Sequence, residues 1–126
     1  MAGDKVESDG VAGAGGVSMH GVDVARGVPA AGMKVELWAM APQPRLLAAG
    51  ELGSNGVWDD PVTRTSSIVA GTYEVRFHAG DYFAASGSAP GILDVVPFRF
   101  VMRDPAQHYH LPLKMTPWGY SLFRGA

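Results

Sequence analysis

Short stretches in which apolar and polar residues alternate, separated by turn-forming clusters, limit the folds open to this chain more than any other feature. Residues 73–78 read Tyr-Glu-Val-Arg-Phe-His, and residues 98–103 read Phe-Arg-Phe-Val-Met-Arg. This period of two is that of a β-strand with one buried and one solvated face. Further strands are predicted at 34–40, 46–52 and 109–115, a spacing typical of antiparallel sandwiches. We therefore expect an all-β, antiparallel β-sandwich.

Two local signals refine this expectation. The dipeptide Asn55-Gly56 predicts a hairpin turn, because a tight primed turn needs positive φ at its central residues. Residues 81–87 form the one stretch that fits a helix, with Asp81 as a cap at its start and Gly87 at its end. The sandwich is therefore expected to carry one short helix.

The length of 126 residues fits a single domain with a two-layer core. Residues 1–16 are rich in glycine, alanine and charged residues and have almost no large apolar residue. Burial of apolar surface therefore cannot offset the conformational entropy that this segment would lose on becoming ordered. We expect a disordered N-terminal arm at 1–16, followed by a β-sandwich domain at 17–126.

Composition excludes several classes of partner and location. A net charge of −2 gives no electrostatic footprint for nucleic acid or an anionic membrane surface. The chain has no cysteine, which fits a reducing compartment. No apolar run has the length of a signal peptide or of a membrane span. We therefore expect a cytoplasmic protein whose partners are small molecules or proteins.

Two histidines stand at strand spacing near the C-terminus. His108 and His110 flank Tyr109 and precede Leu111. Successive side chains on a strand alternate faces, so the two imidazoles project to one side and the apolar residues to the other. One face of this strand is predicted to pack in the core, and the other to carry chemistry.

Four segments together resemble a known family, the transthyretin-like 5-hydroxyisourate hydrolases. They are Ser18-Met19-His20-Gly21-Val22-Asp23, Gly27-Val28-Pro29-Ala30, Gly71-Thr72-Tyr73 and the closing stretch 108–126. Family members carry a His-Tyr-His-Val-Pro-Leu-Leu-Leu-Ser-Pro run and end in Tyr-Arg-Gly-Ser, so the C-terminal likeness is long and specific. The resemblance implies a transthyretin-like (prealbumin-like) sandwich, assembled as a homotetramer with its sites in a groove at subunit interfaces. It also implies a hydrolase of urate degradation that opens a cyclic amide of 5-hydroxyisourate and needs no cofactor.

The resemblance assigns roles to individual residues. His20 and His110 match the two catalytic histidines of the family. The closing residues Phe123, Arg124, Gly125 and Ala126 match its substrate-binding tetrapeptide, with Arg124 at the position of its arginine.

The match also has departures. Phe123 replaces the family's tyrosine, Ala126 replaces its serine, and Val57 stands where the family has an arginine after the Asn/Asp-Gly turn. Trp58 and Lys114 are the candidate residues for a rewritten recognition of the substrate.

The chemistry shows why these departures matter. Opening a cyclic amide needs a base that activates water, a donor for the developing oxyanion and an acid for the leaving nitrogen, and imidazoles can carry the proton steps. His20 and His110 are predicted to divide those steps. Loss of one oxyanion donor costs roughly a hundred- to a thousandfold in rate. Hydrolysis would then depend on another cation, for which Arg64, Arg76 and Lys114 are the candidates.

Other interpretations of the same residues stay open. His108 and His110 can chelate zinc from one strand, with His20 as a third ligand. Arg124 can instead pair with a carboxylate of a neighbouring subunit, and Lys114 can be a solubilising residue on a wet face. The three tryptophans are large enough to serve as core or interface fillers; they are Trp38, Trp58 and Trp118.

Three classes of function remain. The first is a 5-hydroxyisourate hydrolase in which another cation replaces the family arginine. The second is an enzyme that opens or closes a different heterocycle, and the third is a ligand-binding protein without turnover. The two retained histidines weigh against the third class, because a pure binding groove has no evident need for them. Apolar strand faces that carry Trp38 and Met40 favour a subunit interface.

Overall fold

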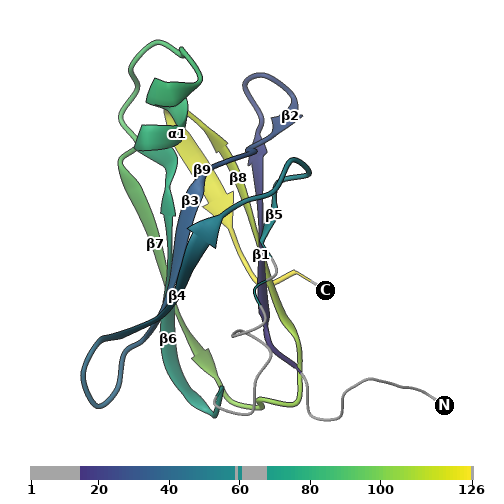
Figure 1. Cartoon of the computed structure of the whole chain (residues 1–126), viewed down its shortest axis with the longest axis vertical. Helices are drawn as coiled ribbons and strands as arrows, with labels where there is room; N and C mark the ends of the chain where they lie inside the picture. The colour runs from purple at the N-terminus through teal and green to yellow at the C-terminus, as the bar shows by residue number, and fades with distance from the viewer. Residues whose placement is uncertain (1–14, 59, 61–67, 126) are drawn as a thin grey trace, which may run out of the picture.

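The computed structural model describes residues 15–58, 60 and 68–125. Two sheets pack face to face, and a short helix lies at one end of the sandwich (Figure 1). The elements in chain order are β1 (Val17–Asp23), β2 (Val28–Pro29), β3 (Lys34–Ala39), β4 (Arg45–Glu51), β5 (Val57–Trp58), β6 (Gly71–His78), α1 (Ala79–Ala85), β7 (Val95–Met102), β8 (Tyr109–Thr116) and β9 (Gly119–Leu122). No helix in this part of the chain has the length and apolarity needed to cross a membrane.

The two sheets differ in how their strands pair. One sheet has the order β4-β3-β6-β7, and all of its neighbours are antiparallel. The other has the order β2-β1-β8-β9, with β5 also paired to β1. In this second sheet β1 and β8 run parallel, which differs from the expectation of purely antiparallel pairing.

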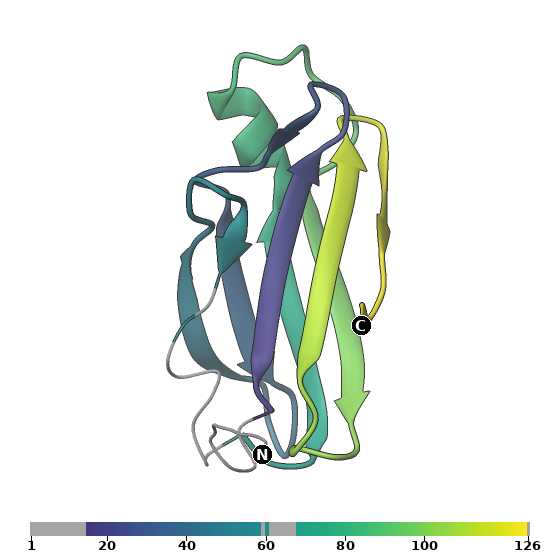
Figure 2. The same cartoon turned by 90° about the vertical axis from the view of Figure 1, so that its right-hand side faces the viewer.

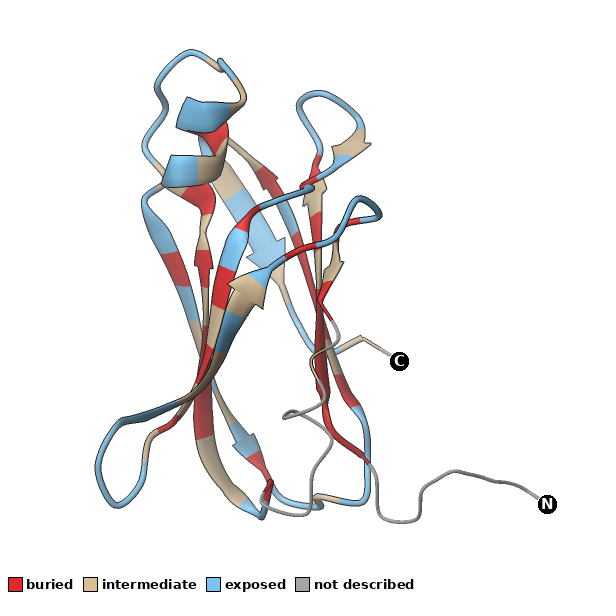
Figure 3. Ribbon diagram, in the orientation of Figure 1, coloured by how far each residue is buried: buried red, intermediate tan, exposed pale blue. Residues whose placement is uncertain are grey.

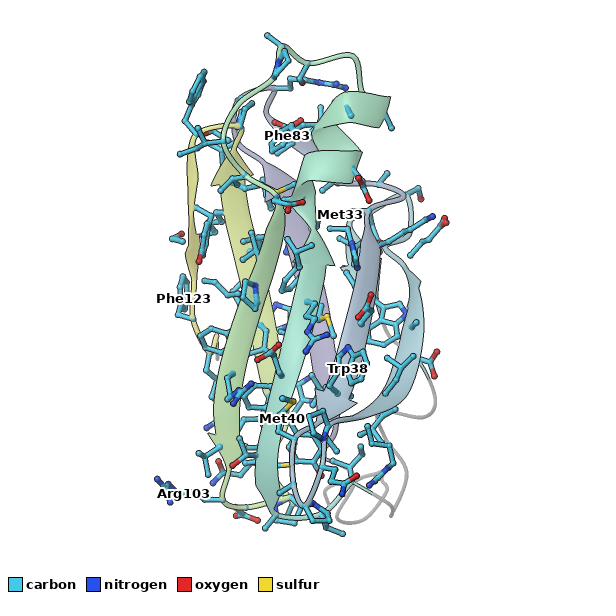
Figure 4. The ribbon with its side chains drawn as sticks, turned by 90° about the vertical axis from the view of Figure 1, so that its left-hand side faces the viewer. Met33, Trp38, Met40, Phe83, Arg103 and Phe123 are labelled. Atoms are coloured by element: carbon cyan, nitrogen blue, oxygen red, sulfur yellow. The ribbon has the colours of Figure 1, made fainter. Side chains whose placement is uncertain are left out.

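The core lies between the sheets and follows the predicted alternation. Buried residues recur at intervals along the strands of both sheets (Figure 3). Phe83 of α1 is also buried and packs over one end of this core (Figure 4). The largest fully buried side chains are Phe77, Met19, Met33, Leu37, Met102, Leu111, Leu113 and Met115. The predicted all-β sandwich with one short helix is confirmed.

The helix begins two residues before the predicted start. It spans Ala79–Ala85, and Asp81 lies in its first turn and is not the cap. The N-cap residue is His78, which makes no side-chain capping hydrogen bond. Gly87 follows the helix with a φ of 79°, so the predicted glycine stop is in place.

The turn at Asn55-Gly56 forms, but it does not make the predicted hairpin. Gly56 has a φ of 79°, and its N–H donates to the carbonyl of Gly53 at 2.8 Å. The strands on either side belong to different sheets, because β4 pairs with β3 and β5 pairs with β1. Leu52 and Trp58, which flank the turn, are both buried in the core. The chain crosses from one sheet to the other between these two residues.

Two residues of the predicted N-terminal arm, Gly15 and Gly16, lie within the described residues. Residues 1–14 lie outside the described residues. Gly15 and Gly16 are buried, and the carbonyl of Gly16 accepts a hydrogen bond from the N–H of Tyr109 at 2.9 Å. The backbone of Gly15 packs so closely against Pro105 and Gln107 that no side chain would fit. The backbone of these two glycines therefore lies against the segment that leads into β8.

Candidate functional site

The candidate site lies on the outer face of the sheet that contains β1 and β8. These two strands lie side by side at the centre of Figure 2, with Ser18 opposite His110 and His20 opposite Pro112. Their neighbours Met19 and Leu111 are buried in the core. Alternation along each strand therefore places Ser18, His20 and His110 together on the outer face.

His20 and His110 form a stacked pair. Their ring centroids are 6.3 Å apart, and the ring planes are inclined by 28°. Both side chains are half-buried. Two imidazoles at this separation can reach the same small molecule lying over the sheet.

The environment of His110 favours its neutral form. Burial lowers the pKa of His110 below its ordinary value, and the neighbouring His20 and His108 imidazoles lower it further. Its Nδ1 atom lies 2.8 Å from Ser18 Oγ, and the same hydroxyl lies 2.7 Å from Nε2 of His108. Nδ1 of His108 in turn contacts the carbonyl oxygen of Gly15. These surroundings therefore favour neutral His110, and its Nδ1 atom lies against a hydroxyl that also contacts His108.

The C-terminal residues return to this site. The N–H of Gly125 donates to the carbonyl of His110 at 2.7 Å, and a Cβ at Gly125 would lie 3.2 Å from Cδ2 of His110. Arg124 donates from Nη2 to the carbonyl of His108 at 3.0 Å, and its guanidinium lies 4.2 Å from the centre of the Tyr109 ring. The chain end is therefore fixed beside His110, while Arg124 is engaged with the start of β8.

Phe123 lies at the edge of the sheet, next to Lys114. Its ring is about half exposed, and it projects from the margin of the molecule in Figure 4. Nζ of Lys114 lies 5.9 Å from the ring centre, within the range of a cation–π contact. Lys114 shares the outer face with His110 but is four positions further along β8. Ala126, the remaining residue of the predicted tetrapeptide, lies outside the described residues.

Val57 and Trp58 face opposite sides of their strand. Val57 pairs directly with His20 in the β1·β5 register, so it flanks the histidine pair on the outer face. Trp58 is 6% exposed and belongs to the core, where its indole packs against Gly50 so closely that a Cβ there would lie 2.6 Å from Nε1. The structure therefore does not bring Trp58 to the candidate site.

Arg76, one of the candidate replacement cations, lies on the other sheet. Its Nε atom bonds to Glu74 at 2.7 Å, and its guanidinium stacks 4.4 Å from the centre of the Trp38 ring, on the sheet face shown in Figure 4. This pairing keeps Arg76 away from His20 and His110 within one chain. Arg64 lies outside the described residues.

The alternative of a zinc site has no support from the geometry. Among residues 15–58, 60 and 68–125, no three His, Asp or Glu side chains are grouped so that they could hold a metal ion. His108 and His110 both direct a ring nitrogen to Ser18 and not to a common point shared with His20.

Ser18 is the site residue that the sequence analysis did not single out. It is 7% exposed and is one of the few buried polar residues among those described. The signal was present, because Ser18 stands two positions before His20 on the same strand and so shares its face. Its pairing with residue 110 depends on the parallel β1·β8 register, which the sequence pattern does not predict.

A two-sheet sandwich with one short helix and a histidine pair on an outer sheet face defines a transthyretin-like protein. Comparison with known families agrees, because the model of the HIUase/Transthyretin family matches residues 17–125. The chain belongs to this family, which confirms the resemblance found in the sequence.

The curated relatives of this chain include proteins named as 5-hydroxyisourate hydrolases. The protein from Deinococcus radiodurans is 43% identical over 114 residues, which cover 88% of this chain and 96% of the relative. The "5-hydroxyisourate hydrolase 2" of Rhizobium meliloti is 40% identical over 116 residues, which cover 89% and 97%.

Solved structures that resemble the fold include two enzymes and a transthyretin. An (S)-allantoin synthase superimposes with a TM-score of 0.82 at 31% identity, covering 89% of this chain and 44% of that protein. The 5-hydroxyisourate hydrolase of Klebsiella pneumoniae gives a TM-score of 0.76 at 27% identity, with coverage of 89% and 99%. Sea bream transthyretin in complex with thyroxine gives 0.79 at 22% identity, with coverage of 87% and 94%, and that likeness concerns the fold alone.

Proposed function

We propose that this chain is a hydrolase of the 5-hydroxyisourate hydrolase type, which opens a cyclic amide of a urate-derived heterocycle by histidine-assisted attack of water. The observation that carries the proposal is the stacked pair of His20 and His110 on the outer sheet face, with ring centroids 6.3 Å apart. The curated relatives that share up to 43% identity are named for that hydrolysis, which supports the same class of reaction here.

The pair divides two proton transfers. His110, whose pKa is lowered, takes a proton from water as the water oxygen forms a bond to the amide carbonyl carbon. His20 gives a proton to the ring nitrogen as the carbon–nitrogen bond breaks. The product is a ring-opened carboxylic acid, and no electrons are exchanged with a cofactor.

The oxyanion donor is where this chain differs from the family pattern. Val57, which flanks His20, offers no side-chain donor, and the N–H of Gly125 is already bonded to His110.

We propose a homotetramer in the cytoplasm in which a neighbouring subunit closes the outer face and Arg124, Phe123, Gly125 and Ala126 contact substrate. Light scattering tests the assembly, and a monomer at micromolar concentration would contradict it.

Hydrolysis is tested with 5-hydroxyisourate made fresh from urate by uricase, by following its ultraviolet decay against the spontaneous rate. We expect acceleration by the wild-type chain and a loss of about a hundredfold or more in His110→Ala and in His20→Ala, because each removes a proton-transfer group. His78→Ala is the matched control, since His78 lies on the other sheet and bonds to Glu36. Full activity in both site variants would refute the assignment.

A second candidate function is the opening or closing of a different heterocycle. It is favoured by the apolar Val57 beside His20, because a valine in this position favours a ring with an apolar substituent over one rich in carbonyl groups. Two results together would support this candidate over the first. The wild-type chain would not accelerate the spontaneous decay of 5-hydroxyisourate, and it would turn over another cyclic amide at a rate that depends on His110.

A further inference from the structure

Three polar groups stand in a row behind His110. The carbonyl oxygen of Gly15 contacts Nδ1 of His108. Nε2 of His108 lies 2.7 Å from Ser18 Oγ, and Ser18 Oγ lies 2.8 Å from Nδ1 of His110. The row begins at a group that can only accept a hydrogen bond and ends at the proposed base.

The direction of every hydrogen bond in this row follows from that first acceptor. A backbone carbonyl has no proton, so Nδ1 of His108 donates to Gly15. A neutral imidazole carries one N–H, so Nε2 of His108 is an acceptor, and the single hydroxyl proton of Ser18 points toward it. The lone pairs of Ser18 Oγ are then left to accept from Nδ1 of His110.

We propose that Ser18 and His108 are positioning residues that hold neutral His110 in the tautomer with a proton on Nδ1 and a free lone pair on Nε2. In this form Nε2 is the atom that takes a proton from water, and the resulting imidazolium keeps its Nδ1 hydrogen bond to Ser18. The catalytic consequence rests on the proposed function, but the tautomer itself can be measured without substrate.

The surrounding fold supports the view that the hydrogen-bonded row from Gly15 to His110 is a fixed feature of the structure. Ser18 is 7% exposed, so water has little access to compete for its hydroxyl. The parallel register places Ser18 opposite His110, and the bond from Tyr109 N–H to the Gly16 carbonyl, at 2.9 Å, extends the ladder to the residue next to Gly15. Backbone pairing therefore sets the positions of Ser18 and His110, and it brings Gly15 and His108 close to them.

Removing either positioning residue should change the tautomer in a defined way. In Ser18→Ala the acceptor for the His110 Nδ1 proton is gone, so both tautomers become populated. In His108→Phe the serine hydroxyl loses its acceptor and is free to donate to Nδ1 of His110, which moves the proton to Nε2. The second change is the more diagnostic, because His108 makes no direct hydrogen bond to His110.

Long-range ¹⁵N–¹H correlation spectra of the full chain, recorded at pH 8, report which nitrogen of each histidine is protonated. The chain has four histidines, and His78 on the other sheet serves as an internal reference. We expect a protonated Nδ1 and an unprotonated Nε2 for wild-type His110, a shift toward protonated Nε2 in His108→Phe, and retention of the wild-type pattern in Ser18→Thr, which keeps the hydroxyl. A protonated Nε2 in the wild type, or an unchanged pattern in both Ser18→Ala and His108→Phe, would overturn the proposal.

Kinetics provide a second readout, which a merely structural role would not give. We expect Ser18→Ala to lower kcat on the order of tenfold with little change in KM, while its midpoint of thermal unfolding stays close to that of the control Ser121→Ala, an exposed serine of β9. Unaltered kcat in Ser18→Ala would count against the proposal. Absence of hydrolysis in the wild type would instead refute the proposed function, and the spectra would still decide the tautomer.

Discussion

At the scale of single residues, strand parity decides which side chains belong to the site. The alternation visible in the sequence correctly placed Tyr109 and Leu111 in the core and His110 outside it. The same rule forbids Val57 and Trp58 from sharing a face, since they are adjacent on β5, although both were candidates for substrate recognition. Parity could be read from the sequence, whereas the partner across the sheet could not.

Val57→Arg tests whether the valine beside His20 limits hydrolysis. A guanidinium there would sit next to His20 and supply a donor for the oxyanion, so we expect kcat/KM for 5-hydroxyisourate to rise on the order of tenfold or more. Val22→Arg is the matched control, because Val22 lies on the same face of β1 and pairs with Pro29 instead. An equal rise in both variants would mean that the added charge only attracts the substrate.

The pKa of His110 should also depend on its neighbour His20. A protonated His20 repels a proton on His110, which is one reason that the pKa of His110 is lowered. We expect His20→Gln to raise the pKa of His110 toward the ordinary value of about 6.5, measured by NMR titration of its Cε1 proton, while His78→Gln leaves it in place. In wild-type assays the rate should fall as pH drops through the pKa of His110. A pKa of His110 that does not move in His20→Gln would contradict this coupling.

At the scale of elements, the sequence pattern predicted the strands better than their connections. The strands predicted at 34–40 and 46–52 correspond to β3 and β4, because alternation within a strand is a local property. The turn at Asn55-Gly56 is predicted at the right place, but the hairpin is not, since β5 pairs with β1 and β4 pairs with β3. The residues of a turn predict the turn itself, but they do not predict which strands pair on either side of it.

The tight approach of this turn to β1 predicts an unusually sensitive glycine. Gly56 has a φ of 79°, and a Cβ there would lie 2.6 Å from the carbonyl oxygen of Gly21 and 3.3 Å from Cδ2 of His20. Gly27 has a similar φ of 70° but open space around it. We expect Gly27→Ala to cost about 1–2 kcal/mol from backbone strain alone, and Gly56→Ala to cost about 1–3 kcal/mol more from the clash.

Urea unfolding of both variants measures this difference, and the activity assay should show a further loss in Gly56→Ala because His20 is displaced. Equal stability of the two variants would show that β5 can move away from β1 at no cost.

At the scale of the whole molecule, the two outer faces of the sandwich have different characters. One carries the histidine pair. The other carries a charged cluster in which Glu74, 7% exposed, accepts from Arg76 at 2.7 Å and from Arg99 at 3.0 Å. Burial raises the pKa of Glu74, but the hydrogen bonds and charges of the two arginines outweigh it and lower the pKa below 4.5. The outer face of the β4-β3-β6-β7 sheet thus carries ion pairs between Glu74 and two arginines. The sequence analysis does not predict these pairs, because they depend on the register between β6 and β7.

Glu74→Gln should reveal this contribution through its pH dependence. The folded chain binds the Glu74 proton less readily than the unfolded chain, so the stabilisation is present above pH 4.5 and is lost as pH falls through the lowered pKa. We expect the difference in unfolding free energy between wild type and Glu74→Gln to be large at pH 7 and to shrink steadily below pH 4.5. Glu51→Gln, which changes an exposed glutamate of β4, is the matched control for the substitution itself. A difference that stays constant from pH 7 to pH 3 would contradict the sign of the shift.

The parallel pairing of β1 with β8 has a consequence for how the chain reaches its native state. Ser18 and His110 are 92 positions apart in the sequence, and parallel neighbours cannot be joined by a local turn. During synthesis β1 emerges early and must wait for residues 109–116 before it gains this neighbour. Such long loop closure slows folding relative to chains dominated by local contacts. The histidine pair therefore cannot form until residues 109–116 have joined β1, and no fragment that stops short of β8 can hold it.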